Sequence, residues 1–419
     1  MSVIKPILKK IYNRLPVFVQ GLIFIIYANL YRLTGRKGND SCKNHSASDI
    51  EEKIQRELIG ASKTVLAICH EFSMTGAPIV LLHLADVLKA QGYKIVIISP
   101  KDGKLFRDEA EKRGIITIYC PDLFETDLVL KLSGLFDKII VQTLICYPVI
   151  NMLKETGKDV MWWIHEGPEI YYGFIARALP RRLPDNIHVY CVGGYARRAL
   201  KCRYPRYRIH NLLYYSPDLK AAKSQESDIY KLINTDKKVF MLVGYYCRRK
   251  GQDILARAID MLPEDVRKGS LFVFVGKFAK EEKEKKSGEY VVKISHKYPD
   301  SVIYSGELSI EQVYRLYSKI DFLICSSRED PMPVVITEAM SLGKPSICSE
   351  NTGSAAIIKR HKAGMTYGFN SPLMLKKRID EAYHMPLDDY NKMSKRARRC
   401  YKHYFSREIF EKNVRKIFE

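Results

Sequence analysis

Short apolar runs alternate with longer amphipathic segments along most of this chain, and the alternation predicts its secondary structure. The runs have the length of buried strands, and the segments between them, such as 79–91, repeat apolar residues at helical spacing. Strands that alternate with helices favour a parallel, doubly wound α/β sheet. The first set of predicted strands comprises 64–70, 94–99, 115–120, 138–143, 160–165 and 188–192.

The same alternation begins again after about residue 220. The polar segment 216–237, which contains several Ser and Lys residues, separates the two cycles and predicts a boundary between domains. A chain of 419 residues is long enough for two ordinary domains, which agrees with two cycles. The second set of predicted strands comprises 238–244, 270–276, 301–305, 320–325 and 345–349.

Residues 1–45 form an extension with a different pattern. An apolar stretch, 17–31, is flanked on both sides by basic residues, and no small-residue cleavage site follows it. The stretch is shorter than the ~20 residues that span a bilayer. We expect an interfacial helix that associates with an anionic membrane surface. The alternative is an amphipathic helix that packs on the body of the protein.

The charge of the chain indicates anionic partners. There are 69 basic and 47 acidic residues, a net charge of +22. The basic residues are dispersed and no recognition motif for nucleic acid is present, so we do not expect a nucleic-acid partner. The ten cysteines show neither Cys-x-x-Cys pairs nor zinc-ligand spacing. We therefore expect reduced thiols, no metal, and a cytoplasmic protein at the inner face of the cell membrane.

The segment 326–345 carries the most chemical information. It follows a predicted buried strand and places acids in a short loop, with Glu338 inside a helix that begins near Pro333 and stops at Gly343 before Pro345. A helix N-terminus binds phosphate, and carboxylates accept hydrogen bonds from a vicinal diol. The pattern therefore fits a nucleotide sugar. Acids that only cap the helix are the alternative.

This segment resembles the signature of the retaining family 4 glycosyltransferases, which have the GT-B fold. The signature is a carboxylate, seven residues, then Glu-Ala-Met in a helix followed by Gly-x-Pro. Asp330 and Glu338 have that spacing, whereas Glu329, the usual residue type, stands one position too early. The resemblance implies that Asp330 contacts a donor-sugar hydroxyl and that Glu338 holds the ribose. It also implies that the backbone N–H groups of Met332 and Val334 face the sugar or the diphosphate.

Two loops in the first half extend the resemblance. Gly76 belongs to a Thr-Gly-Ala-Pro loop like that of family members that assemble polysaccharides, which implies a place under the donor phosphate or sugar. His165 ends a Trp-Trp-Ile-His-Glu sequence, and in similar enzymes this His contacts the donor sugar near the anomeric centre. Imidazole can donate to a sugar hydroxyl near neutral pH. A buried structural His that bonds to backbone is the alternative.

A basic loop in the second half matches the position where the family neutralises the diphosphate. Lys250 corresponds to the family lysine. In the family an arginine usually follows the glycine that stands here as Gly244, but in this chain the next residue is Tyr245. We expect Arg249 to supply the missing positive charge. The alternative is a turn with exposed cations. Without a metal, at least one fixed cation is needed to stabilise the leaving group.

The resemblance implies a GT-B protein, with two Rossmann-like doubly wound domains facing across a cleft. Residues 46–217 would form the acceptor side, 218–389 the nucleotide-sugar side, and 390–419 a helix that crosses back to the first domain. The implied activity is retaining, metal-independent and cofactor-free transfer of a sugar to a glycan, which is expected to be lipid-linked, with His165, Asp330 and Lys250 in the catalytic group. A nucleotide-sugar epimerase of this architecture and a degenerate scaffold of a glycan-assembly complex remain alternatives.

Overall fold

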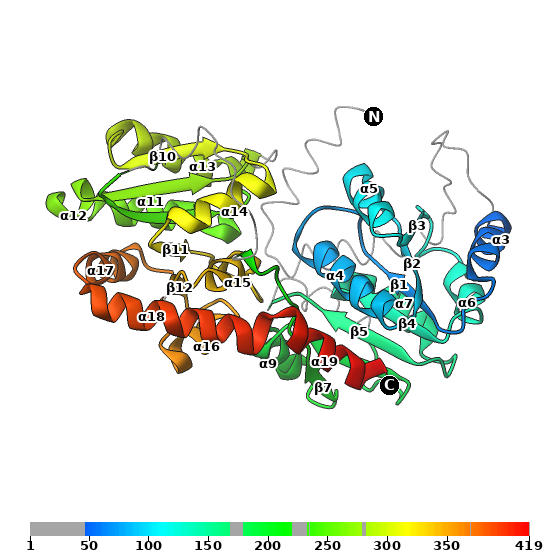
Figure 1. Cartoon of the computed structure of the whole chain (residues 1–419). Helices are drawn as coiled ribbons and strands as arrows, with labels where there is room; N and C mark the ends of the chain where they lie inside the picture. The colour runs from blue at the N-terminus through cyan, green and yellow to red at the C-terminus, as the bar shows by residue number, and fades with distance from the viewer. Residues whose placement is uncertain are drawn as a thin grey trace.

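Two parallel sheets organise the computed structural model, which describes residues 47–167, 179–219, 233, 235–278, 282–368 and 370–418 (Figure 1). The first sheet has the strand order β3-β2-β1-β4-β5-β6-β7, and the second has the order β10-β9-β8-β11-β12-β13. This confirms the predicted doubly wound α/β architecture. The expected N-terminal membrane helix and most of the expected linker lie outside the described residues.

The first sheet and its helices occupy residues 47–211. The six predicted strands agree with the observed ones to within two residues at each end. The seventh strand was not predicted, because only Ile209 of its three residues is apolar and buried. The elements are α3 (Ala47–Leu58), β1 (Thr64–Ile68), α4 (Gly76–Ala90), β2 (Lys94–Ser99), α5 (Lys104–Lys112), β3 (Ile116–Tyr119), α6 (Leu128–Ser133), β4 (Lys138–Gln142), η1 (Leu144–Cys146), α7 (Tyr147–Leu153), β5 (Val160–Ile164), β6 (Ile187–Cys191), α9 (Gly194–Arg203) and β7 (Ile209–Asn211).

The second sheet repeats the arrangement from residue 238 onward. Its five predicted strands are confirmed, and β13 was missed because its apolar run is interrupted by Gly364 and Thr366. The elements are β8 (Lys238–Val243), η3 (Arg248–Lys250), α11 (Gln252–Asp260), α12 (Glu264–Lys268), β9 (Ser270–Val275), α13 (Glu282–Lys297), β10 (Val302–Gly306), α14 (Ile310–Lys319), β11 (Phe322–Cys325), α15 (Val334–Ser341), β12 (Ser346–Ser349), α16 (Ala355–His361), β13 (Gly364–Tyr367) and α17 (Pro372–Tyr383).

The central strands are apolar on both faces because helices cover both sides of each sheet. Every residue of β1, β5 and β9 is buried, as expected for parallel strands between two helical layers. In the second core, Phe240 stacks on Phe272 and Phe322, with ring centroids 5.2 and 5.7 Å apart. These buried aromatic contacts hold the strands from which the loops of the site project.

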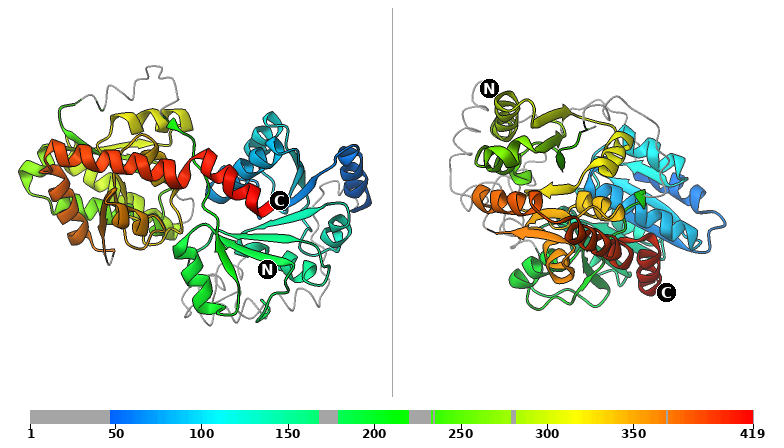
Figure 2. Two further views of the ribbon diagram at one scale, coloured as in Figure 1. Left: turned by 60° about the horizontal axis from the view of Figure 1, so that its bottom comes forward. Right: turned by 60° about the vertical axis from the view of Figure 1, so that its left-hand side comes forward.

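The C-terminal segment links the two halves. Helix α18 (Leu387–Cys400) packs on α15 and α16, and α19 (Arg407–Phe418) packs on α4 of the first half. A π turn, Tyr401–Phe405, joins the two helices, and Figure 2 shows them spanning both halves. Phe410 of α19 lies 6.1 Å from the Trp163 ring and 5.5 Å from the Tyr215 ring, centroid to centroid. The last segment therefore contributes to the core of the first half.

One of the hydrogen bonds that tie the end of the first half to the second is buried at Tyr214. The buried Tyr214 hydroxyl donates to the Met332 carbonyl over 2.9 Å. We expect Tyr214→Phe to lower the free energy of unfolding by about 1 kcal/mol, because the buried carbonyl loses its donor. Urea denaturation measures this change. The matched change Tyr119→Phe, at a ring 40% exposed, should have no measurable effect, and equal stability of the two variants would contradict the role assigned to Tyr214.

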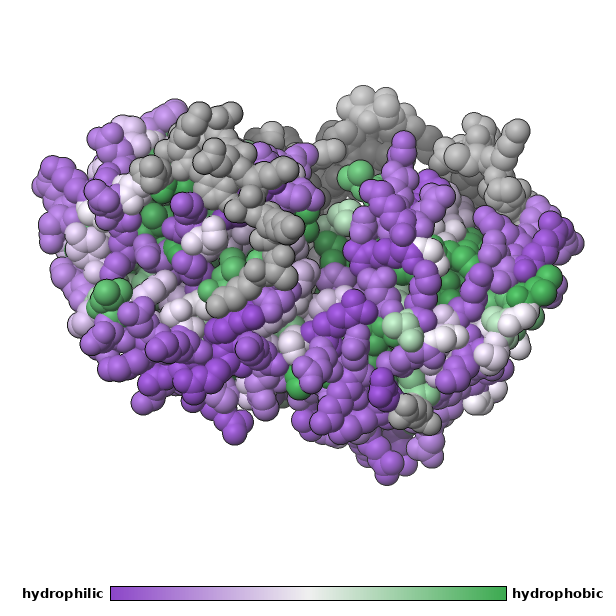
Figure 3. All heavy atoms as spheres, viewed as in Figure 1, coloured by the Kyte–Doolittle hydropathy of each residue, from purple (hydrophilic) through white to green (hydrophobic). Residues whose placement is uncertain are grey.

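The surface is mainly hydrophilic in the view of Figure 3, with scattered apolar side chains. Within the described residues, every helix is too short or too polar to cross a membrane.

Candidate active site

The loop between β11 and α15, residues 326–333, forms the centre of the candidate site and is anchored by side-chain contacts. Ser326 Oγ donates to the Gly251 carbonyl over 2.7 Å. Arg328 forms a bidentate ion pair with Asp253, at 2.8 and 2.7 Å, which joins the loop to α11. The loop ends at Pro333, which is the N-cap of α15. Anchored in this way, the loop holds its acidic residues against the start of a helix.

Asp330 is a buried carboxylate at the middle of a cluster of charges. Its Oδ2 is 2.6 Å from Lys250 Nζ and 3.5 Å from Arg249 Nη1. Its backbone N–H donates to Asn351, and its carbonyl accepts from Gly353. Burial would raise the pKa of Asp330, but Lys250 and Arg249 together lower it below its usual value, so this carboxyl stays ionised.

The structure thus brings together three residues that the sequence assigned to different parts of a donor. Lys250 and Arg249 were expected at the diphosphate, and Asp330 at the sugar. Here both cations pair with Asp330, and the Met332 N–H also donates to that carboxylate. The Met332 N–H therefore points to Asp330 rather than to open space. Val334 is the first residue of α15, where backbone N–H groups have no helical acceptor.

Glu338 lies on α15 with its side chain directed at two tyrosines. Only 8% of Glu338 is exposed, and its Oε2 accepts from the Tyr317 hydroxyl over 2.9 Å. The Tyr314 hydroxyl also bonds to this carboxyl. Burial raises the pKa of Glu338 to about 7, and the tyrosines only partly oppose that shift. The tyrosines were not predicted, although their spacing on α14 places them on one helix face.

In the first half, Gly76 and His165 occupy the carboxyl ends of strands or the loops that follow. Gly76 begins α4, and a Cβ at this position would meet nothing within 4 Å, so open space lies beside it. His165 directly follows β5 and packs against Trp163, with ring centroids 4.7 Å apart. Its Nε2 lies 3.4 Å from Gln142 Nε2. Burial lowers the pKa of His165 to about 3, so the ring is neutral at physiological pH and can donate one N–H.

Three further polar residues at these strand ends were not assigned roles from the sequence. His70 and Glu71 follow β1, and Gln142 ends β4, the neighbour of β1 in the sheet. Glu71 accepts from Ser73, and its Oε1 is 3.8 Å from His70 Nε2. Their positions at the carboxyl ends of adjacent strands are a signal that sequence reasoning could have used.

Glu166 orders the loop beneath His165. Its two carboxylate oxygens accept from the backbone N–H groups of Leu144 and His165, over 2.9 and 3.0 Å. The neighbouring Thr143 adopts a left-handed φ of 70°, a strained conformation for a β-branched residue. Burial raises the pKa of Glu166 to about 7, and the hydrogen bonds from backbone N–H groups only partly oppose this rise. Glu166 therefore positions the loop, and its protonation depends on pH near neutrality.

We expect Glu166 to make the unfolding free energy depend on pH. Its pKa in the folded state lies above the ordinary value of 4.5, so the unfolded state ionises first as the pH rises. The contribution of Glu166 is complete at low pH and is lost as the pH rises through about 7. Relative to Glu166→Gln, the wild type should lose on the order of 2 kcal/mol of unfolding free energy as the pH rises from 4.5 to about 7. Urea denaturation at a series of pH values measures the difference.

A surface glutamate provides the control for this experiment. Glu264 is exposed and pairs with Lys268 at the end of α12. The difference between wild type and Glu264→Gln should not follow the same pH profile. If the unfolding free energy of Glu166→Gln changed with pH in parallel with that of the wild type, Glu166 would not be the group that causes the pH dependence.

No group of three His, Cys, Asp or Glu side chains suited to a metal ion occurs among the residues that the structure describes. The cysteines in these residues are free, and most are buried.

Comparison with known proteins places this geometry in a family. The family model described as Glycosyl transferases group 1 matches residues 224–400, which hold the charge cluster and Glu338. The model described as Glycosyl-transferase family 4 matches residues 61–183, which hold Gly76 and His165. Together the two matches cover most of the chain. The chain belongs to the family 4 glycosyltransferases.

Two Bacillus subtilis proteins are related to this glycosyltransferase in sequence. The chain is 25% identical to YtcC over 186 residues, which are 44% of this chain and 46% of YtcC, so this match spans less than half of that protein. It is 23% identical to spore coat protein SA over 361 residues, which are 82% of this chain and 94% of that protein.

Solved structures show the same fold. Anabaena HepE in complex with UDP and glucose matches with a TM-score of 0.68 and 15% identity, over 85% of this chain and 99% of HepE. WaaG, a glycosyltransferase involved in lipopolysaccharide biosynthesis, matches with a TM-score of 0.64 and 16% identity, over 84% of this chain and 99% of WaaG. The glycosyltransferase therefore has the GT-B fold that the resemblance implied.

Proposed function

We propose that this glycosyltransferase moves a sugar from a nucleotide-sugar donor to a hydroxyl of a glycan, with retention of configuration and without a metal ion. The observation that carries the proposal is the cluster of Lys250, Arg249 and Asp330 in the loop before α15, the helix that carries Glu338. Fixed cations can stabilise a departing diphosphate, and an anionic carboxyl can hold a ribose diol. The UDP and glucose bound to HepE support a donor of this class.

Each residue of the cluster has a chemical role in this proposal. Lys250 and Arg249, which also pair with Asp330, neutralise the diphosphate as it leaves. Asp330 orients a sugar hydroxyl. The acceptor oxygen bonds to the anomeric carbon on the face of the departing phosphate. The bond between the anomeric carbon and the donor's phosphate oxygen breaks, and its electron pair stays on that oxygen. The same phosphate oxygen takes the proton of the acceptor hydroxyl. His165, held neutral by burial, donates its N–H to the sugar.

The proposed acceptor is a lipid-linked glycan in the assembly of a surface polysaccharide. The involvement of WaaG in lipopolysaccharide biosynthesis supports this class of acceptor. The net charge of +22 suits work at an anionic membrane surface. We propose that the protein acts at the cytoplasmic face of the membrane as a peripheral protein.

A panel of UDP-, GDP- and dTDP-sugars, screened by thermal shift, tests the donor, since binding raises stability with ligand concentration. The stabilising donor is then incubated with glycan acceptors, with and without EDTA, and the anomeric configuration of the product is read by NMR. Transfer with retention in EDTA is the expected result. Isomerised nucleotide sugar without transfer would identify an epimerase, and absence of nucleotide binding by calorimetry would indicate a scaffold.

A further inference from the structure

A groove rich in cations lies at the end of the first sheet, away from the donor loop. We call it the cationic groove. It encloses about 750 Å³, a volume in the range of ligand sites. The basic side chains that line it are the arginines Arg182, Arg206 and Arg208, with the imidazoles of His188 and His210 beside them.

The alternation of the two last strands of the first sheet places three of these residues, His188, Arg208 and His210, on one sheet face. Val189 of β6 pairs with Ile209 of β7, and both are buried. The flanking residues His188, Arg208 and His210 are exposed, because successive side chains of a strand point to opposite faces. β7 is the last strand in the sheet order. The groove therefore follows the edge of the sheet.

The arginines of the groove lack carboxylate partners. Within the described residues, Arg182, Arg206 and Arg208 form neither ion pairs nor side-chain hydrogen bonds, whereas Arg113 and Arg328 are each paired with carboxylates. Asp185 is the one acid among the described residues that line the groove. Grouped unpaired cations repel one another, and an anionic ligand would offset that cost.

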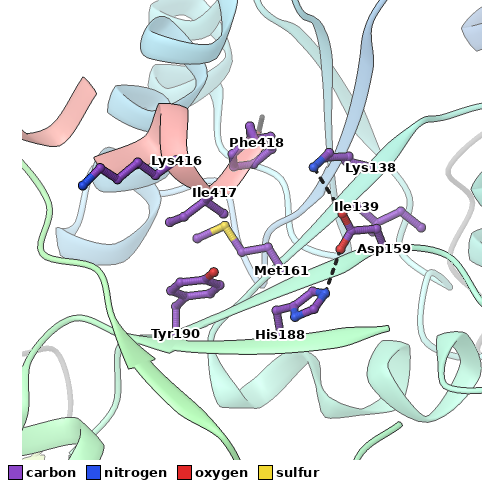
Figure 4. Close-up of a pocket in the computed structure, with 9 residues that line it drawn as sticks. All are labelled: Lys138, Ile139, Asp159, Met161, His188, Tyr190, Lys416, Ile417 and Phe418. Carbon is purple, nitrogen blue, oxygen red and sulfur yellow. Dashed lines mark ion pairs between the residues drawn. The ribbon is translucent and has the colours of Figure 1, made fainter. Parts of the chain in front are cut away.

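A second, smaller pocket next to the groove carries further basic side chains. Figure 4 shows this pocket of about 130 Å³ between the ends of β4–β6 and α19, which shares His188 with the groove. Asp159 lies there between Lys138 and His188, 3.2 Å from each, so this acid is already engaged. Lys416 extends from α19 at the other side of the pocket. Lys138 and Lys416 thus line a pocket that adjoins the groove at His188.

We propose that the cationic groove binds an extended polyanion of the polyphosphate type, not a nucleic acid, whose phosphate groups follow one another along its length, at a site separate from the donor site. A guanidinium group matches phosphate oxygens in a bidentate arrangement. Arg208 and His210 stand two residues apart, about 7 Å along the strand direction, so a chain that follows this edge passes both side chains. A concave site suits a chain that can lie inside it better than it suits a flat bilayer surface.

The test uses full-length protein and a fluorescently labelled inorganic polyphosphate, followed by anisotropy at several salt concentrations. The groove variant combines Arg182→Ser, Arg206→Ser and Arg208→Ser, at exposed positions. The control combines Lys395→Ser, Arg399→Ser and Lys402→Ser, which removes the same charge from exposed positions of α18 and the π turn. The groove variant should bind about tenfold or more weakly, and its slope of log K against log salt should fall by about 2.

The control variant should retain affinity within about threefold of wild type, since only nonspecific charge is lost. Equal losses in both variants would overturn the proposal and assign binding to net charge. Vesicles of phosphatidylglycerol and phosphatidylcholine, and a single-stranded RNA, are measured in parallel. Groove-dependent binding of either one, without polyphosphate binding, would replace the proposed occupant.

This proposal does not rest on sugar transfer. Thermal stabilisation by the nucleotide sugar should be the same in the groove variant and in the wild type. Loss of donor stabilisation in the groove variant would contradict a separate site, and absence of donor binding in every protein would bear on the proposed function alone.

Discussion

Lys250→Ala should lower kcat/KM for the nucleotide sugar by a factor of a hundred or more, about 3 kcal/mol. Two physical effects add in this variant. The diphosphate loses its closest fixed cation, and the buried Asp330 carboxylate loses the partner 2.6 Å away that keeps it ionised. Initial rates at several donor concentrations measure the loss, and calorimetry with the nucleotide separates binding from turnover.

The control for Lys250 is Lys268→Ala, which removes an exposed lysine paired with Glu264 in the same half of the chain. This variant should keep wild-type kinetics. Lys250→Arg retains the charge but changes its geometry, so it should recover only part of the activity. Wild-type kcat/KM in Lys250→Ala would remove this residue from the proposed mechanism.

Glu338→Ala should weaken nucleotide-sugar binding by about 2 to 4 kcal/mol, because a ribose diol loses two hydrogen bonds to a charged acceptor. The binding should also depend on pH. Burial raises the pKa of Glu338 to about 7, so the ionised acceptor is depleted as the pH falls below that value. Donor affinity of the wild type should therefore rise between mildly acidic and mildly alkaline pH. Calorimetric titrations across this range measure it.

Three variants make the Glu338 experiment specific. Glu338→Gln should bind the donor weakly and without this pH dependence, since its amide does not titrate. Tyr317→Phe removes the 2.9 Å hydrogen bond to Oε2 and should move the midpoint of the pH profile upward. Glu264→Ala, at an exposed site, should bind the donor as the wild type does. Unchanged affinity in Glu338→Ala would exclude a ribose contact.

Much of the architecture was predictable because the strands of a doubly wound sheet are buried on both faces. Continuous apolar runs such as those of β1, β5 and β9 are visible without coordinates. The two strands that were missed stand at the ends of their sheets. β7 has two exposed residues among three, so its run is too short and too polar to be recognised.

The candidate site was predictable where chemistry and local structure coincide in one segment. The loop 326–333 and the helix with Glu338 could be read directly, because a proline, two acids and a stop glycine follow a buried strand. The partners of these residues could not. Tyr317 reaches Glu338 from another helix, and Lys250 reaches Asp330 across a separation of 80 residues.

By itself, the sequence determined the doubly wound architecture, the family resemblance and most of the residues that line the proposed donor site, because strand burial, helix capping and short motifs are local properties of the chain. Only the tertiary structure decided which charges meet. The joining of Lys250 to Asp330, the neutral His165 and the edge position of the cationic groove all arise from packing between distant segments, since burial and the proximity of charges depend on neighbours that no local pattern encodes.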